Sequence, residues 1–180
     1  MPTDALVIAS AARLVAAARG VVDDYAAPGA PVSPDQLRVL LAASGCHVEI
    51  FPFHSDAVGM TLPAVHGVQP VFVNGDGAGV DRRLALRHQV AHVLAGEVDG
   101  SVCLAGEGFA RHSERVADLF ALADAVPGWW IAGLVRRQPS WPDARDVIAL
   151  HVAELAPAWP PERVLDRATL RLRMFCDGGI

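Results

Sequence analysis

The sequence predicts an α+β fold in a single domain. Hydrophobic residues recur at helical spacing near both ends of the chain, and between them the period changes to two from Cys46 onward, as is typical of strands. The 180 residues are 52% hydrophobic and 19% charged, which provides one packed core but is too short for two ordinary domains. We therefore expect a single site to carry the function.

Two helices are expected before the first strand. The first is bounded by Thr3 as its N-cap and by Gly20 as its C-terminal stop. The second begins at Ser33, where Gln36 three residues later completes a capping-box sequence, and it ends at Gly45. The segment 26–32 between them is rich in Pro, Gly and Ala and is expected to form a loop.

The period-two segment predicts three short strands, at residues 46–51, 58–63 and 68–74. Turn residues at His66 and Gly67 separate the second strand from the third. Because proline cannot donate a backbone hydrogen bond, Pro70 places the third strand at an edge or near its own start. We expect a small antiparallel sheet of three strands.

The rest of the chain is expected to be helical. Asp81 can cap a helix that runs to about Ala95, and a glycine-rich loop through Gly108 leads to the next helix. The remaining helices are expected at residues 113–126, 129–138, 143–155 and 161–175. We expect residues 1–127 to form the main domain and residues 128–180 to form a C-terminal helical extension packed on the same domain.

The charge balance argues against direct nucleic-acid binding. Twenty acidic residues outweigh fifteen basic ones, giving a net charge of −5, whereas binding through phosphate contacts favours an excess of positive charge. The last predicted helix does have a basic side, formed by Arg163, Arg167, Arg171 and Arg173. Since acidic residues in the last two helices dilute this charge, we expect it to be a solvated or partner-binding face.

Cysteine usage and the amino-terminal sequence predict a cytoplasmic protein. Cys46, Cys103 and Cys176 are an odd number without CxxC spacing, so neither a disulfide framework nor a thiolate zinc site is expected. Asp4 stands where a signal peptide would carry positive charge, and the apolar stretches are too short to span a membrane. We expect cysteine to take no part in a metal site.

His88 and His92 are the first candidates for chemistry. They are four residues apart in the helix predicted from Asp81, so their side chains leave the same face. Leu84 and Ala91 share that face, which therefore points inward. Two inward imidazoles must be hydrogen-bonded or bound to a metal, because burying bare polar groups is costly. The pair by itself also fits structural histidines that are satisfied by hydrogen bonds.

Glu114 is the third candidate ligand. It begins the next helix, where Ala117 and Ala121 allow close packing against the histidine helix. Two His and one Glu leave the fourth position of zinc open, as in catalytic sites. Asp118, one turn later, is placed to accept the outer N–H of a zinc-bound His. Alternatively, Glu114 faces solvent as an acid favoured by the helix N-terminus, or His112 replaces it as ligand.

Two sequence runs resemble the ImmA/IrrE family of zinc metallopeptidases. Residues 83–96, RLALRHQVAHVLAG, look like that family's active-site helix, and residues 113–121, SERVADLFA, followed by Pro127, are similar to its second motif. The resemblance covers about residues 1–127 and implies a minimal zincin-like fold, with a helix pair packed beside a small sheet. It implies zinc (Zn²⁺) ligands at His88, His92 and Glu114, with Asp118 as a helper.

Gln89 departs from the HExxH pattern of that family. The family's Glu takes a proton from the attacking water and returns it to the leaving amine, which an amide cannot do at neutral pH. Loss of a general base costs about 10²–10⁴ in rate. Zinc binding should survive, because this position is not a ligand. Gln89 is explained by natural decay, by an engineered substitution, or by a working variant in which Glu97 or Glu107 serves as base.

The resemblance also implies a substrate. Members of the family cleave a helix-turn-helix transcriptional repressor in stress or phage-immunity regulation, and with Gln89 we expect zinc and substrate binding with little or no turnover. The alternative function is a non-catalytic pseudopeptidase regulator that binds and sequesters a repressor partner. A third hypothesis is DNA contact through the last two helices. In the first two cases the partner, and not this chain, contacts DNA.

Overall fold

The computed structural model describes residues 3–22, 33–53, 56–76, 79–97, 101–106, 111–138 and 140–178, and within these ranges the fold is α+β. The predicted fold class is therefore confirmed. The elements in chain order are α1 (Asp4–Val22), α2 (Pro34–Ala43), β1 (Cys46–Phe51), β2 (Ala57–Thr61), β3 (Gln69–Asn74), α3 (Arg82–Leu94), β4 (Ser101–Leu104), α4 (His112–Ala125), α5 (Gly128–Val135), α6 (Trp141–Leu155) and α7 (Pro161–Gly178).

The sheet differs from the prediction in two respects. Its described part has four strands in the order β1-β3-β2-β4, and it is mixed, because β1 and β3 pair in parallel while β2 pairs antiparallel with β3 and β4. The prediction of three antiparallel strands was wrong. It missed β4, which has only four residues in a glycine-rich connection and shows too little alternation to be recognised alone.

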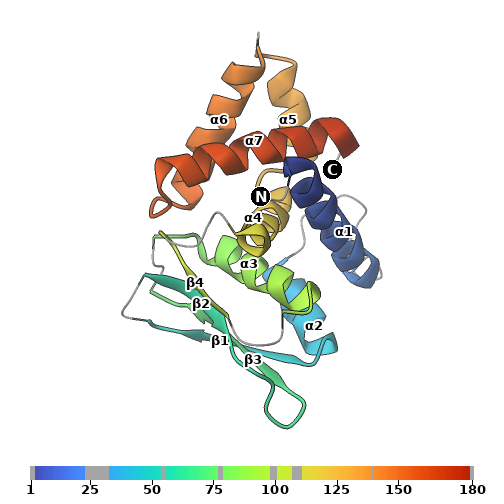
Figure 1. Ribbon diagram of the computed structural model, residues 1–180, viewed down its shortest axis with the longest axis vertical. Coiled ribbons are helices and arrows are strands. Elements are labelled where there is room, and N and C mark those ends of the chain that lie inside the picture. Colours follow the sequence, from blue (N-terminus) through green and yellow to red (C-terminus); the bar gives the residue numbers. More distant parts are fainter. Residues whose placement is uncertain are drawn as a thin grey trace.

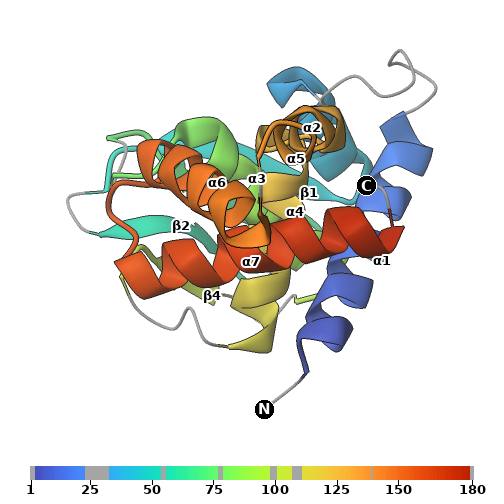
Figure 2. The same ribbon diagram turned by 90° about the horizontal axis from the view of Figure 1, so that it is seen from above.

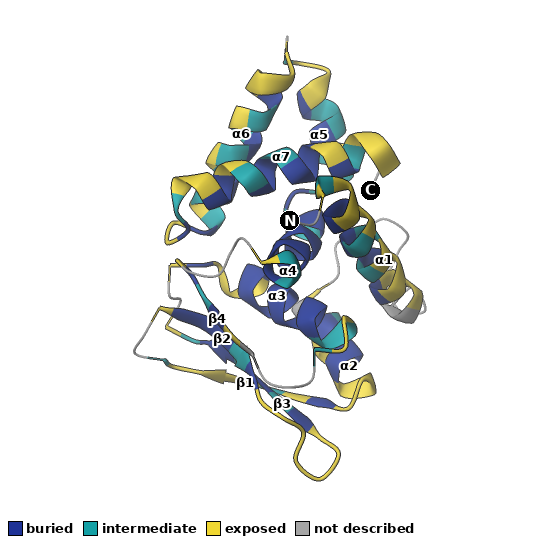
Figure 3. Ribbon diagram, in the orientation of Figure 1, coloured by how far each residue is buried: buried dark blue, intermediate teal, exposed yellow. Residues whose placement is uncertain are grey.

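The helices form layers above the sheet (Figures 1 and 2). Helix α3 contacts β2 and β3 on one side and α4 on the other, and α4 is in turn contacted by α1 and α7. As a result, α3 and α4 are buried along most of their length (Figure 3). Any group that these two helices present to each other lies in the interior of the molecule.

Local sequence signals explain where α2 and α3 begin. Ser33 and Gln36 form both hydrogen bonds of a capping box at the start of α2. The Asp81 carboxylate accepts hydrogen bonds from the backbone N–H groups of Arg83 and Leu84, at 2.8 and 3.2 Å, and so caps α3. The Asp81 cap fixes the first turn of α3 and thereby the direction in which the histidines of this helix point.

The C-terminal helices share their core with the rest of the chain. One continuous cluster of buried apolar residues runs from Val7 in α1 to Met174 in α7. In addition, the Arg163 guanidinium of α7 donates hydrogen bonds to the carbonyl oxygens of Leu104 and Ala105, at 3.2 and 2.8 Å. Helix α7 therefore packs directly against elements that precede it in the chain.

The predicted basic face of α7 is not a surface. Arg163, Arg167 and Arg171 are at most 1% exposed, and of the four predicted arginines only Arg173 is exposed. The interpretation as a solvated or partner-binding face was wrong. These buried arginines donate hydrogen bonds to the Asp118 carboxylate of α4 and to the carbonyl oxygen of Val126, the residue that follows α4. Helical spacing reveals that these arginines share a face but not what that face contacts.

No single helix among the described residues is long and apolar enough to cross a membrane, and the one pair that reaches that length together, α4 and α5, is bent by 77° between its members.

Candidate metal centre

The three predicted ligands meet between α3 and α4. His88 and His92 lie one turn apart on α3, and Glu114 lies in the first turn of α4. All three side chains are buried. The two imidazole Nε2 atoms are 3.0 Å apart, and each lies within 3.4 Å of one oxygen of the Glu114 carboxylate. The alternative in which Glu114 faces solvent is therefore excluded.

A fourth residue, Cys103 of β4, belongs to the same group. Its Sγ lies 3.4 Å from Nε2 of His92 and 3.8 Å from Oε1 of Glu114. One potential ligand atom from each of His88, His92, Cys103 and Glu114 lies within 4.8 Å of all the others, so this buried group could hold a metal ion. We call these four residues the ligand cluster.

A cysteine beside the predicted ligands was not anticipated from the sequence. The expectation that cysteine takes no part in a metal site rested on the absence of CxxC spacing, which detects only cysteines that are neighbours in sequence. Cys103 reaches the cluster because β4 pairs with β2 and runs past α3. The single cysteine between the two helices that carry the histidines and Glu114 was the only signal available.

Each histidine has an acidic partner on its outer nitrogen. Nδ1 of His88 is 2.8 Å from Oδ1 of Asp118, and Nδ1 of His92 is 2.8 Å from Oε2 of Glu97. Asp118 therefore lies where it was predicted, against a histidine ring. Glu97, considered above as a substitute base, instead contacts the far side of His92. Such carboxylates typically orient histidines that bind metals.

These contacts determine which ring nitrogens carry protons. A carboxylate can only accept, so Nδ1 of His88 and of His92 must donate, which leaves Nε2 of each neutral ring as an acceptor. The two Nε2 lone pairs then face each other across 3.0 Å, next to the carboxylate of Glu114. Acceptors packed this closely require a proton or a metal cation among them. The cluster fits a bound cation.

The ionisation of the cluster reflects the same imbalance. Burial works against a charged His92, but Cys103 and Glu97 outweigh burial and raise its pKa to about 9. For His88, burial is likewise outweighed by Asp118 and Cys103, and the pKa lies well above its usual value. Burial also disfavours the Cys103 thiolate, yet the two histidines lower the pKa of that thiol to about 7. The site thus attracts positive charge.

Gln89 lies on α3 beside the cluster but is not a member of it. Its side chain is fully buried, and among the described residues neither its amide nitrogen nor its amide oxygen has a hydrogen-bond partner. It packs against Gly59 of β2, where a Cβ atom would come within 2.9 Å of the amide nitrogen. The glycine therefore provides the space in which the amide lies.

His112 and His66 do not join the cluster. His112 begins α4, but Glu114 occupies the position facing α3, so the substitution of one for the other is not observed. His66 lies in the exposed turn before β3, with a positive φ of 52°. His54 and Glu107 lie outside the described residues.

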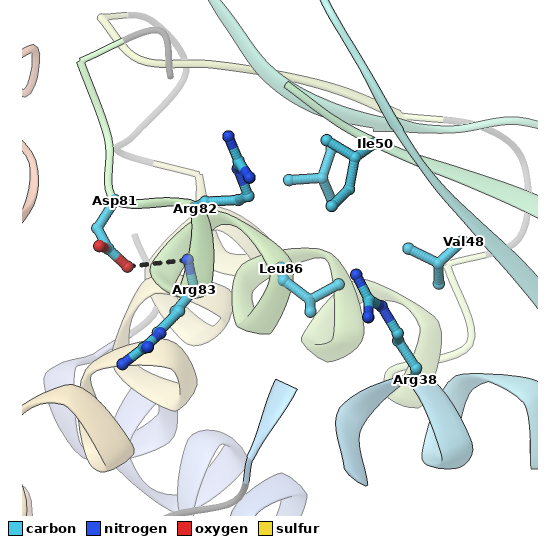
Figure 4. A pocket seen from close by; sticks show the side chains of 8 residues that line it. Arg38, Val48, Ile50, Asp81, Arg82, Arg83 and Leu86 are labelled. Atoms are coloured by element: carbon cyan, nitrogen blue, oxygen red, sulfur yellow. Dashed lines mark hydrogen bonds between the residues drawn. The ribbon is translucent and has the colours of Figure 1, made fainter. Parts of the chain in front are cut away.

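The described residues leave little space at the cluster. The hollow that His88 and Cys103 line has a volume of only about 10 Å³, close to the minimum for one water molecule. A larger cavity of about 440 Å³ lies between α2, the strands and the start of α3 (Figure 4). No member of the ligand cluster lines that cavity, which is bordered by Arg38, Val48, Ile50, Val73, Asp81, Arg82, Arg83 and Leu86.

Comparison with known proteins gave no matching family model, no matching curated protein and no matching solved structure. The assignment of a function therefore depends on the residues and geometry of the ligand cluster, together with the two sequence runs described above.

Proposed function

We propose that this chain is a zinc-binding protein of the ImmA/IrrE metallopeptidase type whose peptide-bond turnover is lost or strongly weakened. The observation that carries the proposal is the meeting of His88, His92 and Glu114, whose imidazole Nε2 atoms and carboxylate oxygens lie within 3.4 Å of one another. Imidazole nitrogen and carboxylate oxygen are ordinary ligands of zinc. A zinc ion held by these residues would act as a Lewis acid toward a peptide carbonyl.

Gln89 accounts for the loss of turnover. A metallopeptidase needs a base that accepts a proton and returns it to the leaving group, and an amide does neither at neutral pH. The nearest candidate substitute, Glu97, is engaged with Nδ1 of His92 at 2.8 Å. The chain thus keeps groups suited to holding the ion and lacks one suited to moving the proton.

The proposed partner is a helix-turn-helix repressor protein, bound in the cytoplasm. This part of the proposal comes from the family resemblance. It is supported by the net charge of −5, and by the burial of three arginines that would otherwise offer a basic surface to DNA. In this proposal the repressor contacts nucleic acid and the present chain contacts the repressor.

A second function, that of a non-catalytic regulator which sequesters the repressor, is favoured by the small space that the described residues leave at the site. The ligand cluster is buried, and the hollow beside it is about 10 Å³, far smaller than a peptide. A protein that binds its partner elsewhere on its surface needs no path to the metal. The two functions differ in whether peptide-bond cleavage can be restored at this site.

Metal analysis tests the zinc site. We expect one zinc per chain after dialysis against zinc, and its loss in His92→Ala, because this variant removes a ligand from the centre of the cluster. His47→Ala is the matched control, since His47 is an exposed histidine of β1 and should leave the stoichiometry at one. A parent protein that remains free of metal at saturating zinc would overturn the proposal.

Restoration of the base separates the two functions. Gln89→Glu would be incubated with zinc and the helix-turn-helix repressor encoded beside this protein, and the products would be followed by mass spectrometry. Cleavage at one position supports a peptidase disabled by Gln89. Binding without cleavage supports the sequestering regulator. Neither binding nor cleavage would overturn the assignment of that repressor as partner.

A further inference from the structure

Cys103 has surroundings that packing alone does not explain. The chain offers a comparison in Cys46, which is also buried but whose Sγ has only weak contacts, at 3.8 and 3.9 Å, with oxygen atoms of Ser44 and Gln69. Sγ of Cys103 instead faces the metal-facing nitrogen of His92 and the carboxylate of Glu114. Of the two buried cysteines, only Cys103 meets imidazole and carboxylate groups, which are ordinary zinc ligands.

The separations within the ligand cluster match the edges of a coordination tetrahedron. Zinc bound at ordinary lengths to two nitrogens, one oxygen and one sulfur would hold its ligand atoms roughly 3.3–3.6 Å apart. With Oε1 as the Glu114 ligand atom, the separations among His92, Cys103 and Glu114 and between the two histidines are 3.0–3.8 Å, and all four ligand atoms lie within 4.8 Å of one another. The sulfur fits this pattern as well as the three atoms that sequence analysis had already selected.

Strand β4, which carries Cys103, is held in place by β2 and by Arg163. It pairs antiparallel with β2, with Cys103 opposite Gly59. At its end, the guanidinium of Arg163 donates hydrogen bonds to the carbonyl oxygens of Leu104 and Ala105. Arg163 is itself fixed by Asp118, the residue that also contacts His88. The backbone that carries the thiol is therefore fixed by the same groups that orient the cluster.

We infer that Cys103 is the fourth protein ligand of the metal, so that the site is closed. This inference rests on the proposed zinc site. Catalytic zinc sites keep one position for water or substrate, whereas sites with four protein ligands are structural. Here the sheet edge supplies a thiolate at the position that would otherwise be open. The metal then links α3, α4 and β4, and Gln89→Glu alone does not open a position for a substrate.

Cobalt(II) spectroscopy tests the inference without any measurement of activity. Thiolate bound to Co²⁺ gives a charge-transfer band in the near ultraviolet, and tetrahedral coordination gives strong visible bands. The decisive variant is the double substitution Cys46→Ser with Cys176→Ser, which keeps Cys103 as its sole cysteine. We expect it to bind one Co²⁺ per chain and to retain the full thiolate band.

Three outcomes are distinguishable. The expected bands in the double variant support Cys103 as ligand. Stoichiometric Co²⁺ binding without a thiolate band would overturn the inference and leave a site of His88, His92 and Glu114. Absence of Co²⁺ binding in the parent protein would overturn the zinc site, and the inference with it.

A competition titration adds a quantitative check. Cys103→Ser should lose the thiolate band and weaken zinc binding by more than the roughly 10–100-fold that follows loss of an outer partner. Cys46→Ser is the matched control, because it also removes a buried thiol but should leave zinc affinity unchanged. Equal affinities for the two variants would overturn the inference.

Discussion

Two groups of buried charged residues meet at Asp118, and their charges are compensated in different ways. In the arginine cluster, formed by Asp118, Arg163 and Arg167, the Asp118 carboxylate accepts three hydrogen bonds from guanidinium groups at 2.8–3.0 Å. The chain itself supplies the countercharge. The two arginines outweigh burial and hold the pKa of Asp118 far below its usual range.

The ligand cluster has no arginine countercharge. Its members turn two imidazole nitrogens, a carboxylate and a thiol toward one point, and no Arg side chain hydrogen-bonds to any of them among the described residues. Buried charge needs a partner in either case. Arginines of the chain supply that partner in the first cluster, whereas under the proposed function a cation from solution supplies it in the second.

The largest expected effect comes from breaking the balanced cluster. Asp118→Ala removes the buried anion that Arg163 and Arg167 share and the acceptor of His88, although Arg167 keeps its contact with Asp166. We expect the free energy of unfolding to fall by about 3–5 kcal/mol, as when one partner is removed from a buried ion pair. Urea denaturation measures the change. Asp146→Asn, in an exposed pair with Arg145, is the control, and equal urea midpoints for the two variants would contradict the role given to Asp118.

The unbalanced cluster should respond to metal. Zinc that binds only the folded chain stabilises it by about 2.7 kcal/mol when free zinc is 100 times the dissociation constant. We expect this gain in the parent, its reversal by a chelator, and no gain in His92→Ala. Thermal unfolding with and without zinc measures it. An equal gain in His92→Ala would show that zinc acts elsewhere.

Crowding beside the ligand cluster gives a smaller effect. In Gly59→Ala the new Cβ would lie 2.8 Å from the Phe72 carbonyl oxygen and 2.9 Å from the Gln89 amide nitrogen. We expect a loss of about 1–3 kcal/mol, typical of overpacking. Gly20→Ala is the matched control, because nothing lies within 4 Å of its Cβ position in α1. That control should be neutral or stabilise by up to roughly 1 kcal/mol, and similar losses in both variants would refute the tight fit at Gln89.

The smallest effect is expected at Asp4, a half-buried carboxylate that pairs with Arg115. The hydrogen bond from Arg115 lowers the pKa of Asp4 from its usual 3.8, so this carboxylate stabilises the fold above pH 3.8 and its contribution is lost as the pH falls through the lowered value. Asp4→Asn should cost no more than about 1 kcal/mol at neutral pH, since solvent reaches the Asp4 side of the pair and screens it. In strong acid the two proteins should unfold alike. A difference that grows on acidification would reverse the assigned sign.

Much of the fold followed from signals that act over a few residues. Ser33 with Gln36, and Asp81, predicted the starts of α2 and α3 because a cap bonds to backbone groups two or three positions away. The helix pair could be anticipated for a similar reason, since a spacing of four places His88 and His92 on one face. Strand β4 could not, because four residues carry too little periodic pattern.

Helical spacing in the sequence was enough to predict which residues share a helix face: the two histidines of α3, Glu114 with Asp118 on α4, and the arginines of α7. What each face contacts became known only from the packing of the elements. This packing buried Arg163 and Arg167 against Asp118, and it brought Cys103 from a sheet edge into the ligand cluster. The physical reason is that caps and helical spacing act within one element, whereas ligand sets and ion pairs depend on how separate elements pack.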